Sequence, residues 1–270
     1  MGLDANSVPA HTQLGLVLLD RGGNQDALRS LDRAIELDPE YHRAYGNRSL
    51  SHSRAGEPRL ALADYAKAIE IGPEYGLAYS NRASVYLLQG NLTLAIADLD
   101  RAIELDPENA TGYLNRGAVR AAAGELGLAV EDYDKAIMAD PTSLNAYINR
   151  ASAFDELGRH SEAISDYGNA LHLAPGTAAL YTNRGGSFHA QNDLQNALAD
   201  FEQAVALVPT SVPAWYNLGV VHEDLGELEM AVAAYRQAIS FEPENIDALI
   251  NRPLVYSTLG EYSSTIVDAD

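Results

Sequence analysis

Asparagine and arginine stand side by side six times in this sequence, always at a multiple of 34 residues from one another. A seventh asparagine, Asn217, keeps the same spacing but is followed by Leu218. An asparagine amide offers one carbonyl acceptor and two N–H donors, and an arginine guanidinium offers five donors and a fixed positive charge. Such a row is suited to hydrogen bonding and ion pairing. The six pairs are Asn47-Arg48, Asn81-Arg82, Asn115-Arg116, Asn149-Arg150, Asn183-Arg184 and Asn251-Arg252.

Residue groups that would break bonds or hold a metal ion form no recognisable motif. Cysteine is absent, which excludes a disulfide framework, a thiolate metal site and a cysteine nucleophile. None of the seven histidines lies in a metal-binding spacing such as HExxH. The glycines mark helix ends, and no serine lies in a nucleophile elbow. We therefore expect no enzymatic activity, no cofactor and no metal site, unless a catalytic domain follows Asp270.

The charge balance restricts the class of partner. The chain carries 18 basic and 38 acidic residues, a formal net charge of −20. A field of that sign repels nucleic-acid phosphates and anionic lipid, so we expect no nucleic acid and no membrane as partner. A protein or peptide that is neutral or basic fits better. We see no signal peptide or transmembrane run, and we expect a cytoplasmic protein.

A repeat of 34 residues organises the chain. Seven prolines follow one another at this spacing without insertion: Pro39, Pro73, Pro107, Pro141, Pro175, Pro209 and Pro243. An alanine precedes each proline by five residues and another by twelve, with a bulky residue eight before it. Each period begins with a helical pattern that stops at glycine, or at Asn192 in one copy, because these residues tolerate the left-handed conformation. A second helical pattern, which carries the alanines, ends before the proline.

These features resemble the tetratricopeptide repeat, as in the copy Tyr113, Gly117, Gly124, Ala129, Tyr133, Ala136 and Pro141. The resemblance implies an all-α fold, an α-solenoid of helix-turn-helix repeats that form a right-handed superhelix, with the first helices lining a concave groove. We assign one solenoid to 8–270, preceded by the extension 1–7. The repeats are 8–41, 42–75, 76–109, 110–143, 144–177, 178–211, 212–245 and the partial 246–270. In the last of these, Pro253 stands within a helical pattern, and we expect it to kink or shorten that helix.

The arginines of the repeated pairs vary together with aspartates sixteen residues later. Where the arginine is replaced, by Leu14 or Leu218, the aspartate is replaced as well, by Ser30 or Ala234. We predict an ion pair between the two helices of each repeat, with the arginine stem packed along apolar surface. The alternative is that duplication copied both residues without contact. The pairs are Arg48/Asp64, Arg82/Asp98, Arg116/Asp132, Arg150/Asp166, Arg184/Asp200 and Arg252/Asp268.

The asparagines occupy the sixth position of each repeat, which in the family faces the concave groove. The row resembles the asparagine ladder in the tetratricopeptide domain of O-linked N-acetylglucosamine transferase, which implies contacts with the main chain of an extended peptide. The alternative is that each amide only bonds a neighbouring repeat. The predicted peptide-binding asparagines are Asn47, Asn81, Asn115, Asn149, Asn183, Asn217 and Asn251.

The two ends of the predicted groove differ in character. Toward 76–143 its later positions are apolar, with Leu87 and Leu88 as candidate contacts. Toward 144–245 the candidates are mainly acidic: Asp155, Glu156, His189, Glu223 and Asp224. The carboxylate clamp of co-chaperone domains in this family needs cations that these groove positions lack, so an acidic tail is a poor ligand.

The sequence thus favours a non-catalytic scaffold that binds an extended peptide segment in a concave groove. Two alternatives remain open at this point. One is a structural module that associates with itself through the chain ends, and the other is the targeting domain of a longer enzyme.

Overall fold

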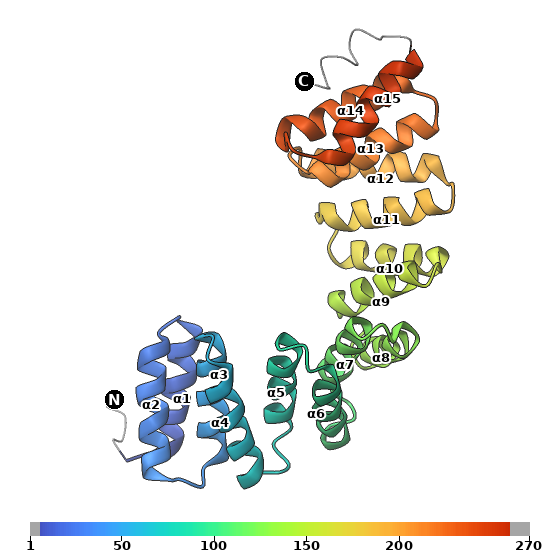
Figure 1. Ribbon diagram of the computed structural model, residues 1–270. Helices are drawn as coiled ribbons and strands as arrows, with labels where there is room; N and C mark the ends of the chain where they lie inside the picture. The colour runs from blue at the N-terminus through green and yellow to red at the C-terminus, as the bar shows by residue number, and fades with distance from the viewer. Residues whose placement is uncertain (1–5, 260–270) are drawn as a thin grey trace. The chain divides into compact units, whose positions relative to one another are not determined.

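The computed structural model describes residues 6–259, which form fifteen α-helices and no strand in that range (Figure 1). The predicted all-α chain of helix-turn-helix repeats is confirmed. The chain divides into two compact units, Met1–Pro141 and Thr142–Asp270. The first contains α1 (Val8–Asp20), α2 (Asn24–Leu37), α3 (His42–Arg54), α4 (Pro58–Ile71), α5 (Gly76–Leu88), α6 (Leu92–Leu105), α7 (Ala110–Ala122) and α8 (Leu126–Ala139). The second contains α9 (Leu144–Glu156), α10 (His160–Leu173), α11 (Ala178–Ala190), α12 (Leu194–Leu207), α13 (Val212–Asp224), α14 (Leu228–Phe241) and α15 (Ile246–Leu259).

The turn inside each repeat has the predicted left-handed residue. Six glycines there have φ between 72° and 77°, and Asn192 has φ 60°. At each of these turns a short loop reverses the chain between the two helices of the repeat. The glycine prediction is confirmed for Gly22, Gly56, Gly90, Gly124, Gly158 and Gly226, whereas Gly260 lies outside the described residues.

Each repeat is held together by a large side chain of the second helix that fills a gap on the first. The alanines on both sides of this side chain are fully buried, and the side chain itself is at most 3% exposed. In several repeats the facing residue is a glycine. A Cβ atom placed on Gly185 would lie 2.8 Å from the Phe201 ring, and one on Gly219 would lie 2.5 Å from the Tyr235 ring. The small residue is therefore required by the size of its partner.

In the first unit the repeats stack through alternating helices. The second helix of one repeat contacts the first helix of the next, as α2 contacts α3, α4 contacts α5 and α6 contacts α7. The first helices also contact each other from α1 to α3, α5 and α7. First helices therefore form a continuous row within this unit, and the residues at their exposed positions share one surface.

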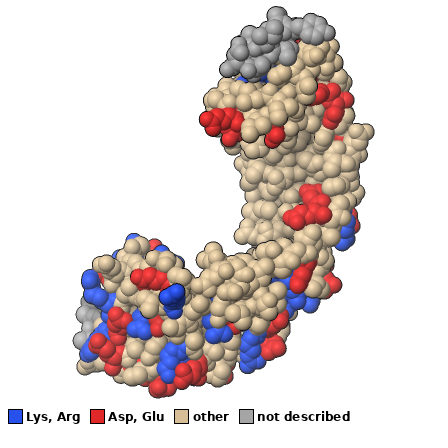
Figure 2. Space-filling model, viewed as in Figure 1, with Lys and Arg blue, Asp and Glu red and all other residues tan. Residues whose placement is uncertain are grey.

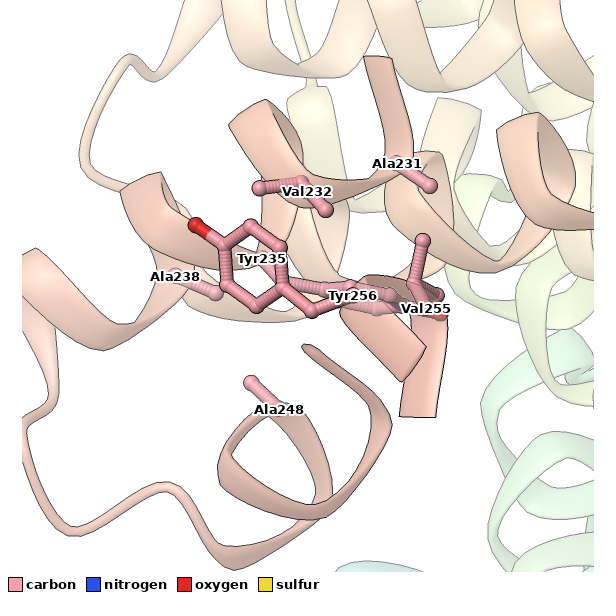
Figure 3. Close-up of a cluster of buried hydrophobic side chains, with 7 residues drawn as sticks. All are labelled: Ala231, Val232, Tyr235, Ala238, Ala248, Val255 and Tyr256. Atoms are coloured by element: carbon pink, nitrogen blue, oxygen red, sulfur yellow. The ribbon is translucent and has the colours of Figure 1, made fainter. Parts of the chain in front are cut away.

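The second unit repeats this arrangement, with α10 against α11, α12 against α13 and α14 against α15. Its last cluster joins Tyr235 and three neighbours on α14 to Ala248, Val255 and Tyr256 on α15 (Figure 3). The prediction that Pro253 would shorten its helix is wrong, because α15 runs through it from Ile246 to Leu259. Buried contacts on both sides of the proline offset the lost backbone hydrogen bond.

Candidate functional site

The repeated arginines form the predicted ion pairs. In five repeats, Nε and Nη2 of the arginine donate to the two carboxylate oxygens of the aspartate sixteen residues later, at 2.6–2.9 Å. The aspartates are buried, so both partners are largely withdrawn from water. The prediction is confirmed for Arg48/Asp64, Arg82/Asp98, Arg116/Asp132, Arg150/Asp166 and Arg184/Asp200. The sixth predicted partner, Asp268, lies outside the described residues.

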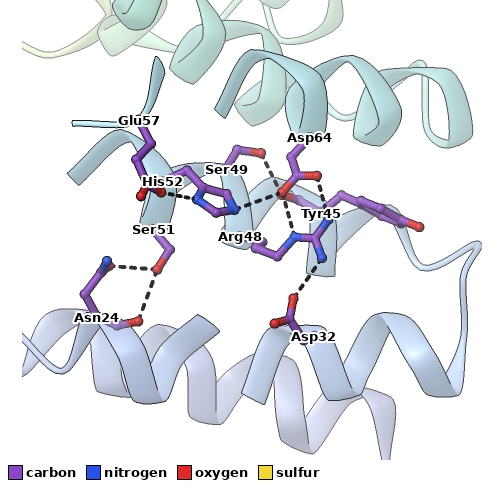
Figure 4. A network of polar contacts seen from close by, with 9 residues as sticks. All are labelled: Asn24, Asp32, Tyr45, Arg48, Ser49, Ser51, His52, Glu57 and Asp64. Atoms are coloured by element: carbon purple, nitrogen blue, oxygen red, sulfur yellow. Dashed lines mark hydrogen bonds and ion pairs between the residues drawn. The ribbon is translucent and has the colours of Figure 1, made fainter. Parts of the chain in front are cut away.

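Further contacts hold each guanidinium in place. The Arg48 guanidinium carbon lies 5.5 Å from the centroid of the Tyr45 ring, and the other four arginines lie over the equivalent tyrosine at 5.7–5.8 Å. A second aspartate, from the preceding repeat, binds Nη1 of Arg48 through Asp32 at 2.8 Å (Figure 4). Hydrogen bonding to Asp64 raises the pKa of Arg48 against the opposing effect of burial, and Asp32 adds to this rise.

These contacts make the arginines structural residues. Asp100 plays the same second role for Arg116, at 2.6 Å. The sequence analysis missed both of these contacts between repeats, although the signal was available as an aspartate sixteen residues before the arginine.

In the first unit the predicted groove residues do not share a pocket. Asn47 is nearly buried, at 9% exposure, and Asn81 and Asn115 are half-buried. Leu87 is half-buried, whereas Leu88 is 87% exposed. The pocket on the first helices of this unit, about 290 Å³, lies near their N-terminal ends and includes Arg43, Leu77, Ser80 and Asn109 among its lining residues.

In the second unit a pocket of about 530 Å³ brings several predicted residues together. It contains Asn183, Asn217 and Asp155 of the predicted set. The other predicted residues of this unit, Asn149, Asn251, Glu156, His189, Glu223 and Asp224, are not in its lining. The sequence analysis missed the remaining lining residues, which are Ser152, His160, Tyr167, Thr182, Gly186, Ser187 and Pro213.

Small residues leave the pocket open. Ser152 and Gly186 stand at the ninth position of their repeats, where other repeats have Leu50 or Val220. A Cβ atom on Gly186 would meet no heavy atom within 4 Å. A longer side chain at this position would therefore extend into the pocket without disturbing the packing of α11.

The predicted acidic residues have hydrogen-bond partners within the protein. Asp155 accepts from the Ser187 hydroxyl at 2.8 and 2.9 Å, and it pairs with Nδ1 of His160 at 2.9 Å. In the next two repeats Asp224 pairs with Nε2 of His189 at 2.6 Å. These contacts link neighbouring elements, since Ser187 belongs to α11 and Asp155 to α9. The carboxylates therefore brace the groove wall as well as lending it negative charge.

Two buried tyrosines connect such carboxylates to the asparagine row. The Tyr167 hydroxyl hydrogen-bonds to Asp155 and to Asn183, and burial followed by the Asp155 charge raises the pKa of Tyr167. The Tyr235 hydroxyl donates to Glu223 at 2.9 Å. The sequence signal for this link is an acidic residue twelve positions before the tyrosine, which occurs in both repeats.

The charge on the second unit has one predominant sign. Residues 142–270 hold 17 acidic residues against five arginines, and they contain no lysine. Arg150 and Arg184 belong to the ion pairs above, and Arg159 pairs with Glu162 at 2.9 Å. In Figure 2 the visible surface of α9–α14 is mostly uncharged with acidic patches, while lysine and arginine gather on the first unit. A bound segment would meet an uncharged to negative surface there.

Two other site classes find no candidate in the described residues. Between residues 6 and 259, no group of three or more His, Cys, Asp or Glu side chains is arranged to hold a metal ion. No helix in that range is long and apolar enough to cross a membrane.

Several solved structures share this fold. YrrB, described as a TPR protein with an unusual peptide-binding site, is 25% identical over 70% of this chain and 97% of its own, with a TM-score of 0.62. The C-terminal part of a TPR repeat-containing protein from Cytophaga hutchinsonii is 17% identical over 88% of this chain and 98% of its own, with a TM-score of 0.73. PilF from Pseudomonas aeruginosa is 22% identical over 82% and 97%, with a TM-score of 0.68.

Family models match most of the chain. Models described as TPR repeat match 83–124 and 185–226. Models described as tetratricopeptide repeat match 12–76, 144–177 and 212–245. Proteins of this kind generally mediate protein–protein interactions. The matched segments, the paired helices and the conserved 34-residue spacing within the chain agree, and the protein belongs to the tetratricopeptide repeat family.

Proposed function

We propose that this protein is a non-catalytic scaffold that binds an extended peptide segment of a partner protein in the groove of the second unit. The observation that carries the proposal is the pocket that contains Asn183 and Asn217 above the small residues Ser152 and Gly186. The peptide-binding site named for YrrB supports the same class of function.

The geometry of the pocket suits a peptide main chain. Asn183 and Asn217 belong to adjacent repeats, so their amides can meet successive polar groups of an extended segment. Each amide provides the donors and the acceptor that a backbone C=O and N–H require. Gly186 leaves space for that backbone to approach. The excess of acidic residues in this unit favours a neutral or basic segment.

The other predicted asparagines and the apolar pair Leu87 and Leu88 remain part of the proposal as further contacts. Asn81 and Asn115 are partly exposed on the first helices of the first unit. Leu88 offers an exposed apolar surface there, which suits an apolar part of the bound segment. Asn47 contributes least, because little of its side chain is exposed.

A peptide array tests the proposal. The full chain is screened beside the double variant Asn183→Ala/Asn217→Ala, and circular dichroism confirms that both are folded. We expect a set of extended peptides that bind the unchanged protein and bind the variant at least tenfold more weakly, because several hydrogen bonds of about 1 kcal/mol each are lost. Absence of binding peptides, or unchanged binding by the variant, contradicts the proposal.

A second candidate function is self-association, which a row of exposed apolar residues on α15 favours. Ile246, Ile250 and Leu254 are 69%, 55% and 59% exposed, and their spacing of four places them on one helix face. Light scattering at increasing protein concentration would show a rising mass, and Ile250→Lys would abolish the rise. A constant monomer mass would exclude this candidate.

A further inference from the structure

We infer that Tyr167 and Tyr235 orient the amides of Asn183 and Asn251 so that the amide carbonyl oxygens face the groove and accept N–H groups of the bound segment. This inference rests on the proposed function and specifies the chemistry that the ligand must present. It assigns Asp155 and Glu223 as positioning residues that act through the tyrosines.

The first step is the direction of each tyrosine hydroxyl. A hydroxyl has one proton, and a carboxylate is an acceptor only. The Tyr235 hydroxyl donates this proton to Glu223 at 2.9 Å. The Tyr167 hydroxyl is buried beside Asp155, its hydrogen-bond partner. In both repeats the tyrosine proton is therefore directed to the carboxylate.

The second step is the direction of each amide. Asn183 hydrogen-bonds to the Tyr167 hydroxyl, and Asn251 hydrogen-bonds to the Tyr235 hydroxyl. Since each hydroxyl has given its proton to a carboxylate, only its oxygen lone pairs remain. The asparagine must therefore donate through its Nδ2 atom. The carbonyl oxygen of a planar amide lies on the side away from this contact.

The Asn251 amide is fixed most completely. Its Nδ2 atom also donates to the Tyr216 hydroxyl, at 3.2 Å. Both of its N–H groups thus have acceptors within the protein, Tyr235 on one side and Tyr216 on the other. Only the carbonyl oxygen remains to bind a ligand, and a carbonyl oxygen can only accept.

The repeat between them provides an internal contrast. Sixteen residues before Asn217 stands Phe201, where Asn183 and Asn251 have Tyr167 and Tyr235. Phe201 is 1% exposed and has no hydroxyl. The structure therefore gives Asn217 no tyrosine to set its amide, which can present either its donors or its acceptor.

The ligand chemistry follows from this pattern. A bound segment needs a main-chain N–H opposite Asn183 and another opposite Asn251. Proline has no N–H and is excluded from both places. Opposite Asn217 either a C=O or an N–H is accepted.

The test uses the tightest peptide found with the array. Each of its amide N–H groups is replaced in turn by an ester oxygen, and the affinity of every member for the full chain is measured. We expect one replacement to weaken binding by about tenfold in the unchanged protein, as is usual for one lost hydrogen bond in a desolvated site. In Asn183→Ala the same replacement should change affinity by less than about twofold, which identifies the N–H that Asn183 binds.

Tyr167→Phe then separates orientation from packing. It keeps the buried ring and removes only the hydroxyl, so the penalty for the ester at the Asn183 position should shrink while penalties elsewhere stay. Asp155→Asn, whose amide oxygen still accepts from Tyr167, should retain more of this penalty than Asp155→Ala. Tyr235→Phe provides the same measurement at Asn251 if Tyr167→Phe fails to fold.

The outcomes distinguish the two proposals. If no peptide binds the unchanged protein, the proposed function fails and this inference fails with it. If peptides bind but a folded Tyr167→Phe keeps the full ester penalty, the amide does not depend on the tyrosine. The inference is then overturned while the proposed function stands.

Discussion

Each arginine of the repeat depends on a carboxylate that has little access to water. Asp132 is the most enclosed of these, with no exposed surface, and it accepts from Nη2 of Arg116 at 2.6 Å and from Nη1 of Arg120 at 2.8 Å. Removing one member of a buried ion pair leaves the other charge uncompensated, which costs more than the pair contributes when intact. At this position two arginines would lose the same partner.

We predict that Asp132→Ala lowers the free energy of unfolding by about 3–5 kcal/mol. Asp100→Ala is the matched control, because Asp100 also binds Arg116 but its side chain is 47% exposed. The control should cost at most about 1 kcal/mol. Urea denaturation of both variants measures the difference, and equal losses would show that burial does not govern these pairs.

His42 gives the first unit a sensitivity to acid. Burial, with a further contribution from Arg43, lowers the pKa of His42, and Glu74 opposes this. A lowered pKa means that the unfolded chain takes up the proton more readily than the folded one. Stability is therefore lost as the pH falls below the ordinary histidine value of about 6.5.

We predict that the unchanged protein loses more stability than His42→Gln between about pH 7.5 and pH 5.5. Urea midpoints of the two proteins at each pH give the comparison. If the midpoints of the two proteins fall in parallel over this range, His42 is not responsible.

At this scale the sequence predicted some contacts and missed others for a physical reason. The Arg–Asp pairs were predictable because both members change together where a repeat departs from the pattern. The hydroxyl of Tyr167 was not, because its neighbours Asp155 and Asn183 come from two different helices and each is replaced independently in other repeats. The roles of Ser187 and His160 also depend on a contact between helices that spacing alone does not reveal.

At the scale of helices, packing within a repeat depends on one small residue facing one large ring. Gly185 and Gly186 are neighbours on α11, but they face different surroundings. A Cβ atom on Gly185 would lie 2.8 Å from the Phe201 ring, whereas one on Gly186 would meet nothing within 4 Å. The two positions therefore separate the effect of packing from that of helix propensity.

We predict opposite effects for the same substitution at these neighbours. Gly185→Ala should destabilise the protein by about 1–3 kcal/mol, because the buried ring cannot move away freely. Gly186→Ala should be neutral or stabilise by up to about 1 kcal/mol, since alanine favours the helix and has room. Thermal and urea unfolding measure both, and destabilisation by Gly186→Ala would contradict the open space described at that position.

The order and length of the helices were the most predictable part of the fold. Seven prolines, the glycine turns and the paired alanines each recur at 34 residues, so every repeat tests the same interpretation. Pro253 was the exception, because a local rule about proline gave way to the buried contacts of Val255 and Tyr256 on the same helix. The division into two units was not foreseen, since the repeat spacing is unbroken across it.

At the scale of the whole molecule, charge is divided unevenly between the two units. Thirteen of the 18 basic residues precede residue 142, and the second unit has no lysine. A basic segment is therefore attracted to the second unit by a field as well as by contacts. Such attraction between exposed charges weakens as salt is added.

We predict that a lysine added to an array-selected peptide strengthens binding several-fold at about 50 mM salt, and that the gain disappears near about 500 mM salt. A glutamate at the same place should weaken binding. Fluorescence anisotropy with labelled peptides measures both effects, and a gain that is independent of salt would indicate a direct contact instead of the field.

Calorimetric titration of the tightest array peptide into Gly186→Leu tests the central claim most directly. The leucine would occupy the pocket beside Asn183 without crowding α11, because the space around Gly186 is open. Gly127→Leu on α8 is the matched control, since its Cβ atom also meets nothing within 4 Å and it lies outside the pocket. We predict that Gly186→Leu weakens binding at least tenfold while Gly127→Leu leaves it unchanged. Unchanged binding by a folded Gly186→Leu would contradict the assignment of this pocket as the peptide site.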